Sequence, residues 1–176
     1  MTRTHTRRRL TGMTPVSLRR LALAGMVALL VGAAACAETP EPETPDPAQD
    51  DSIEAVRTRA EAGDAVAQFN LGVRYDFGLG VPEDDVEAMA WYRQAAEQGY
   101  ASAQYSLGFM YSTGIGVPQD DVEAYKWFNL ATTYADEEYR ELYADQRDTA
   151  ADRLTPEQRV EAQRLAREWF EAHPPD

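Results

Sequence analysis

The sequence is poor in cysteine and histidine. Cys36 is the single cysteine in 176 residues, and the two histidines, His5 and His173, lie near opposite ends of the chain. One cysteine excludes an intramolecular disulfide and a site built from several thiolates. Serine and cysteine hydrolases need a base beside the nucleophile, so scarce histidine counts against them and against His-rich zinc sites. We therefore predict no catalytic residue, metal site, cofactor or small-molecule substrate.

Basic residues are also scarce, and they are unevenly distributed. The chain has 17 Lys and Arg against 30 Asp and Glu, and six of the basic residues but no acid lie in residues 1–35. Removing those six leaves 11 bases against 30 acids, a net charge of −19. A body this acidic repels phosphate backbones and acidic membrane surfaces, which argues against nucleic-acid binding. Its charge favours a basic partner.

The chain has no apolar run long enough to span a bilayer. The run at residues 21–35 is 15 residues long, short of the roughly 20 that a transmembrane helix needs. It follows Arg19-Arg20 and ends in small residues, the pattern of a secretory signal. Residues 1–35 are therefore predicted to be a signal peptide, and a start at Met13 would give it an ordinary length. Twin-arginine export is an alternative that the flanking residues fit poorly.

Two cleavage sites compete at the end of this signal. Residues 33–36, Ala-Ala-Ala-Cys, resemble the lipobox of bacterial lipoproteins, although Ala33 stands where leucine is usual. The resemblance implies a lipidated N-terminal Cys36 and, with Ala37 next to it, an outer-membrane location. Ordinary cleavage after Ala37 would instead leave a soluble periplasmic protein. The rest of residues 36–50 is rich in proline and acid, which predicts a disordered tether of about 40 Å.

An internal repeat dominates the remaining sequence. Residues 64–99 laid over residues 100–135 match at 17 of 36 positions. A period of this length is typical of stacked units that cannot bury their apolar faces alone. With room for one folded domain in the chain, we expect repeat 1 at 64–99 and repeat 2 at 100–135, between an N-terminal capping helix at 51–63 and C-terminal capping helices at 136–176.

Each unit has the pattern of a helix, a turn and a second helix. Small and apolar residues recur at four-residue steps from Ala67, and the glycines and proline of residues 78–82 then break the helix. Asp84 is predicted to cap the second helix in a capping box with Glu87, and Gly99 to end it. The expected buried side of the second helix comprises Val86, Ala88, Trp91 and Ala95. The acidic pairs at the helix starts are explained by capping, and the paired glycines by the turn.

Both units resemble the Sel-one-like repeat (SLR) family, a relative of the tetratricopeptide repeats. The shared pattern runs from Ala67 to Ala95 and again from Ala103 to Ala131, through Ala-Gln, Leu-Gly, Gly-x-Gly-Val-Pro, Asp-Asp and Trp. The resemblance implies an all-α fold, a right-handed α-solenoid of helix-turn-helix repeats. In the C-terminal segment Thr155 is predicted to cap a last helix, whose apolar stripe comprises Val160, Ala162, Leu165, Ala166, Trp169 and Phe170.

The family resemblance also implies where a partner docks, because first helices line the concave face of such solenoids. On a helical wheel, one face of each first helix lies opposite the recurring stripe. The hypothetical partner surface comprises Phe69, Asn70, Val73, Arg74, Tyr105, Ser106, Phe109 and Met110. The alternative is that some of these side chains pack against the adjacent repeat.

These features together predict a non-enzymatic protein-protein interaction module held at a bacterial envelope membrane by its N-terminal lipid. A permanent structural role in an envelope complex is a variant of the same prediction. The alternative from another class is a peptidoglycan-binding or cell-wall-active protein that uses carboxylates such as Asp136, Glu137 and Glu138. Glycoside hydrolysis needs two carboxylates at a fixed separation, which no sequence spacing establishes.

Overall fold

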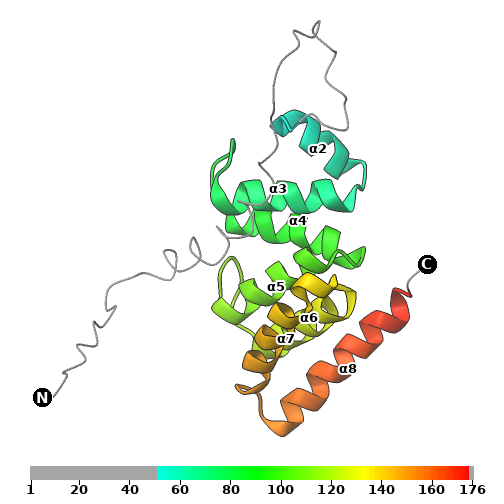
Figure 1. Cartoon of the computed structure of the whole chain (residues 1–176). Coiled ribbons are helices and arrows are strands. Elements are labelled where there is room, and N and C mark those ends of the chain that lie inside the picture. The colour runs from blue at the N-terminus through cyan, green and yellow to red at the C-terminus, as the bar shows by residue number, and fades with distance from the viewer. Residues whose placement is uncertain (1–50, 175–176) are drawn as a thin grey trace, which may run out of the picture. The chain divides into compact units, whose positions relative to one another are not determined.

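The computed structural model describes residues 51–174, which form seven α-helices and no strand (Figure 1). The helices are α2 (Ile53–Glu61), α3 (Ala65–Phe77), α4 (Asp85–Glu97), α5 (Ala101–Thr113), α6 (Asp121–Tyr134), α7 (Glu137–Ala151) and α8 (Pro156–Ala172). None of these helices is long and apolar enough to cross a membrane. The predicted signal peptide, Cys36 and the tether lie outside the described residues.

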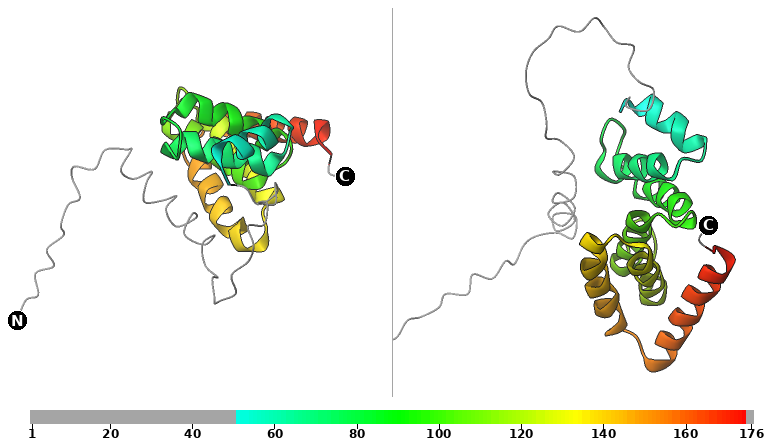
Figure 2. Two further views of the ribbon diagram at one scale, coloured as in Figure 1. Left: turned by 90° about the horizontal axis from the view of Figure 1, so that it is seen from above. Right: turned by 45° about the vertical axis from the view of Figure 1, so that its right-hand side comes forward.

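Consecutive helices from α2 to α7 pack side by side as a stack of antiparallel pairs (Figures 1 and 2). The predicted all-α solenoid is therefore confirmed. The last helix departs from this order, because α8 packs on α6. Helix α6 thus contacts α5, α7 and α8, and the apolar clusters on either side of it hold the C-terminal part of the stack together.

The helix boundaries follow from the capping residues. Asp64, Asp84 and Asp120 each accept two backbone N–H bonds at a helix start, at 2.9 to 3.1 Å. Such caps satisfy amides that the helix itself leaves without partners. The capping box of Thr155 with Gln158 is present as predicted. The one predicted for Asp84 with Glu87 is wrong, since the backbone N–H of Asp84 donates to the carbonyl of Tyr75 at 2.9 Å.

Each repeat is closed by an aromatic ring lying against a glycine. Tyr92 of α4 covers Gly72 of α3, and Phe128 of α6 covers Gly108 of α5. A Cβ atom at either glycine would lie 2.6 Å from the ring, which is inside van der Waals contact. Only glycine therefore lets the two helices of a repeat pack at this separation.

One buried glutamine in each repeat joins that repeat to the helix before it. Gln68 donates its amide N–H to the carbonyl of Ala60, and Gln104 donates to the carbonyl of Ala96, both at 3.1 Å. The bonds are 36 residues apart and satisfy carbonyls near the ends of α2 and α4. The helix α2 therefore packs on repeat 1 as α4 packs on repeat 2.

Some predicted packing positions are wrong. Val86 is 66% exposed, because α4 buries the face that carries Ala88 and Tyr92 instead. Val160 is also 66% exposed, and α8 is anchored through Ala162 and Ala166 on its other side. The wide apolar stripe predicted for the last helix is thus a narrower one.

A buried hydrogen bond distinguishes the first repeat from the second. The hydroxyl of Tyr92 donates to a carboxylate oxygen of Asp76 at 2.9 Å, and both residues are buried. At the corresponding positions repeat 2 has Phe128 and Ser112. The hydroxyl and the carboxylate therefore occur together in one repeat and are both replaced in the other.

Replacing Tyr92 with phenylalanine should lower the free energy of unfolding by about 1–3 kcal/mol, since it removes a hydrogen-bond donor from the buried carboxyl group of Asp76. The double variant Tyr92→Phe/Asp76→Ser, which copies repeat 2, should be more stable than the single variant because it also removes the buried carboxylate. Urea unfolding followed by circular dichroism measures both changes. Equal stability of wild type and Tyr92→Phe would contradict the prediction.

Candidate partner-binding surface

The predicted partner surface occupies equivalent positions of α3 and α5. Two of its aromatic members, Phe69 and Tyr105, each contact a ring of their own repeat and a ring of the next unit. The Phe69 ring lies 5.6 Å from that of Tyr92 in the same repeat and 5.2 Å from that of Tyr100 in the next, and the Tyr105 ring stacks on that of Tyr143 in α7 at 4.6 Å. These two rings therefore pack within the stack, as the alternative interpretation expects, and are half-buried rather than fully buried.

Two residues of the predicted surface must be corrected to packing residues. Met110 is 2% exposed and Ser106 is 8% exposed. Met110 belongs to the apolar cluster that α4, α5, α6 and α8 share. The helical wheel placed Ser106 outward because it considers one helix at a time, whereas a solenoid helix has neighbours on several sides. Met110 lies seven residues after Ala103 and therefore borders the recurring stripe on the wheel itself.

The other six predicted residues keep accessible atoms. Val73 and Phe109 are half-buried at the edges of apolar clusters. Asn70 is half-buried too, and Arg74 donates to the carbonyl of Asp51 just before α2. The accessible surface thus comprises Phe69, Asn70, Val73, Arg74, Tyr105 and Phe109.

Burial also affects the charge of this surface. Desolvation raises the pKa of Tyr105 and of Tyr143, with which it stacks. In Tyr143 a hydrogen-bond contact between its hydroxyl and that of Ser102, at 3.4 Å, works against the increase. Both tyrosines are therefore neutral near pH 7, so they offer apolar faces and hydroxyl groups.

Polar contacts between successive units also recur, and the sequence analysis missed them. Arg57 of α2 donates to the hydroxyl of Tyr75 at 3.3 Å, and Arg93 of α4 donates to that of Tyr111 at 2.7 Å. Both members recur 36 residues apart. A comparison extended upstream of residue 64 would have found the recurring arginine.

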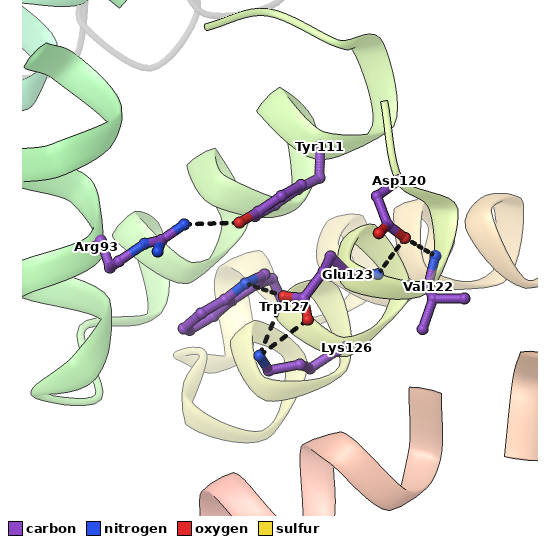
Figure 3. A network of polar contacts seen from close by, with 7 residues as sticks. All are labelled: Arg93, Tyr111, Asp120, Val122, Glu123, Lys126 and Trp127. Atoms are coloured by element: carbon purple, nitrogen blue, oxygen red, sulfur yellow. Dashed lines mark hydrogen bonds and ion pairs between the residues drawn. The ribbon is translucent and has the colours of Figure 1, made fainter. Parts of the chain in front are cut away.

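The second of these contacts lies near a polar network on α6 (Figure 3). Glu123 accepts from the indole N–H of Trp127 at 3.0 Å and from Lys126 at 3.1 Å. The ammonium group of Lys126 also lies 4.6 Å from the centroid of the Trp127 ring. Burial raises the pKa of Tyr111, although the charge of Arg93 works in the opposite direction.

Of the acidic residues proposed as glycan ligands, only Glu137 has a side-chain partner among the described residues. Asp136 is the N-cap residue of α7, and Glu137 forms an ion pair with Arg140. Within residues 51–174, no group of three or more His, Cys, Asp or Glu side chains is arranged to hold a metal ion.

Comparison with known proteins agrees with the repeat period. The Sel1 repeat model matches residues 65–100 and 101–133. The chain belongs to the Sel1 repeat family. These matches begin one residue after each of the predicted units, and they cover the helix pairs α3–α4 and α5–α6.

Solved structures of two bacterial proteins resemble this Sel1 repeat chain. One is a protective antigen of uropathogenic Escherichia coli with an SLR fold, with 37% identity and a TM-score of 0.63 over 69% of this chain. The match covers 25% of that protein, so this chain spans a quarter of its length. The other is a Sel1 repeat protein from Oxalobacter formigenes, with 39% identity and a TM-score of 0.49 over 53% of this chain and 70% of that one. None of the curated proteins matches.

Membership of the Sel1 repeat family suggests a protein-protein interaction module. The fold is typically a non-catalytic scaffold. Such a fold suits protein binding because stacked helix pairs present an extended surface, built from equivalent positions of successive repeats.

Proposed function

We propose that this Sel1 repeat protein is an exported adaptor that binds a basic partner protein at the envelope of a bacterial cell. The net charge of −19 after the first 35 residues supports a basic partner, since complementary charge accelerates and orients association. The apolar run before Cys36 supports export, and Cys36 itself supports a lipid anchor in the outer membrane.

The observation that carries the adaptor function is the recurrence of accessible side chains on successive first helices. Phe69 and Tyr105 occupy equivalent positions of α3 and α5, as do Val73 and Phe109, and all four are half-buried. A partner segment lying across α3 and α5 would meet the same pair of contacts in each repeat. Asn70 and Arg74 would supply polar contacts beside them.

Substituting lysine at Asn70 tests this surface without removing a core side chain. The added positive charge should repel a basic partner and lower its recovery severalfold, because like charges facing each other across an interface disfavour association. Asn129→Lys on α6 is the matched control, because Asn129 is also half-buried but lies on a second helix. The full chain, with an affinity tag inside residues 38–50, would be cross-linked in cells and its partners quantified by mass spectrometry. Equal recovery with both variants would refute the surface.

Anchoring is tested by replacing Cys36 with serine. We expect the wild-type protein to sediment with membranes and to incorporate labelled fatty acid, because acyl chains at Cys36 would hold it there. The Cys36→Ser variant should lose the label and move to the soluble fraction. A variant that still sediments with membranes would refute the lipid anchor and leave the partner surface untouched.

A further inference from the structure

A pocket of about 270 Å³ lies where three helices end. Its walls are residues 97–99 at the end of α4, Tyr134 at the end of α6, and Trp169, His173 and Pro174 at the end of α8. The three helices meet there because α8 packs back on α6 (Figure 1). The pocket is separate from the partner surface on α3 and α5.

The ends of these helices make the pocket electronegative. A helix C-terminus carries a partial negative charge and exposed carbonyl groups. Neither α4, α6 nor α8 has a basic residue in its last turn. Arg140 reaches the carbonyl of Ala135 after α6, but it also pairs with Glu137. The walls of the pocket contain no lysine or arginine.

Glu97 adds a full negative charge at this place. Its side chain is exposed, and it forms no hydrogen bond or ion pair with any residue in the described part of the chain. Because this carboxylate has no hydrogen bond within the fold, it can accept one from a ligand without breaking an existing contact. The pocket therefore favours a cation.

Aromatic rings form the other wall. The Trp169 and Tyr134 rings meet edge to face at 85°, with centroids 5.9 Å apart. The ring of His173 stacks on Trp169 at 4.3 Å, and its Nδ1 lies 2.8 Å from the Trp169 carbonyl oxygen. Ring faces attract cations, and the flat guanidinium group of arginine both stacks on them and bonds carboxylates.

The preceding repeat junction lacks this arrangement. Gln98 occupies the position equivalent to Tyr134, and its amide donates to the Gly63 carbonyl at 3.0 Å and to Gln68 at 2.7 Å. A Cβ atom at Gly63 would have no neighbour within 4 Å, whereas one at Gly99 would lie 3.7 Å from the Tyr134 ring. Of these two junctions, only the one at Gly99 and Tyr134 therefore forms the pocket.

We propose that this pocket receives an arginine side chain from a basic segment of the partner protein. The guanidinium group packs against the aromatic wall formed by Trp169 and Tyr134, and the Glu97 carboxylate accepts its N–H bonds. That the arginine belongs to a partner protein rests on the proposed function. Binding of an arginine side chain to the pocket does not rest on that function, and it can be measured on the purified chain.

The test is a titration of the ¹⁵N-labelled full chain in non-ionic detergent with N-acetyl-arginine amide at 150 mM salt, followed by NMR. The three tryptophans give separate indole N–H signals, and the Trp169→Phe variant identifies the one in the pocket. We expect this signal to move in a saturable way while those of Trp91 and Trp127 stay in place. Glu97→Lys should raise the dissociation constant about fivefold, because it removes an attractive charge and adds a repulsive one.

Glu61→Lys is the matched control, because Glu61 is exposed at the equivalent position of α2. It should change the dissociation constant less than about twofold, given the screening of distant charges at this salt concentration. Equal loss in both variants, or no movement of the Trp169 signal, would overturn the pocket. Tighter binding of N-acetyl-lysine amide would overturn the assignment to arginine. Partner recovery that is lost in Asn70→Lys but retained in Glu97→Lys would refute the partner's arginine while leaving the adaptor function intact.

Discussion

Replacing Gly108 with alanine is expected to lower the free energy of unfolding by about 1–3 kcal/mol, the cost of forcing extra volume into a packed core. The new Cβ atom would lie 2.6 Å from Cδ1 and 2.8 Å from Cε1 of Phe128, a buried ring with little room to move. The same change in an exposed helix would stabilise it by about 1 kcal/mol. The sign of the change therefore reports the contact between α5 and α6.

A double-variant cycle separates this contact from other effects. Phe128→Leu removes the ring atoms that the new Cβ would meet, so Gly108→Ala should cost less in that background than in the wild type. Thermal and urea unfolding followed by circular dichroism provide the four stabilities. Equal costs in both backgrounds would show that the ring does not limit the approach of the two helices.

Replacing Gly116 with alanine should cost more stability than replacing Gly80, its equivalent in repeat 1. Both glycines have positive φ, +70° and +79°, so each substitution bears a similar backbone penalty of about 1–2 kcal/mol. A Cβ atom at Gly116 would also lie 2.7 Å from the carbonyl oxygen of Asp85 in the preceding repeat, whereas at Gly80 the nearest atom, on Arg74, is 3.9 Å away. We expect an additional loss of about 1–3 kcal/mol at Gly116 from this overlap.

The difference between these two variants measures how closely the repeats are stacked. Gly80→Ala serves as the control for backbone strain, since its turn has no preceding complete repeat to contact. Urea unfolding of both variants gives the comparison directly. If the two lose equal stability, the contact between the second turn and Asp85 does not contribute to the stack.

Local features were predicted well because short-range chemistry produces them. The capping aspartates bond amides two and three residues away, and the glycines at 78 and 114 adopt positive φ within the turn itself. Nothing distant is needed for either effect. The repeat period was equally visible, because 17 of its 36 positions recur as identical residues.

The predicted partner surface was less successful for the opposite reason. Ser106 was placed on the outward side of an isolated α5, yet it is buried, and so is Met110 at the border of the recurring stripe. Their burial depends on the neighbouring helices α4 and α6, both of which pack against α5. The same limitation affected Val160, where α8 turns its alanines toward α6.

The sequence by itself determined that this chain is an acidic stack of two Sel1 repeats, because periodicity, caps and turn glycines act within a few residues of one another. Only the tertiary structure decided which side chains remain accessible and which other helix ends lie beside the end of α8. The pocket at Glu97, Tyr134 and Trp169 brings together residues up to 72 positions apart. That arrangement depends on how α8 folds back on α6, and no local pattern in the sequence encodes the direction of such a return.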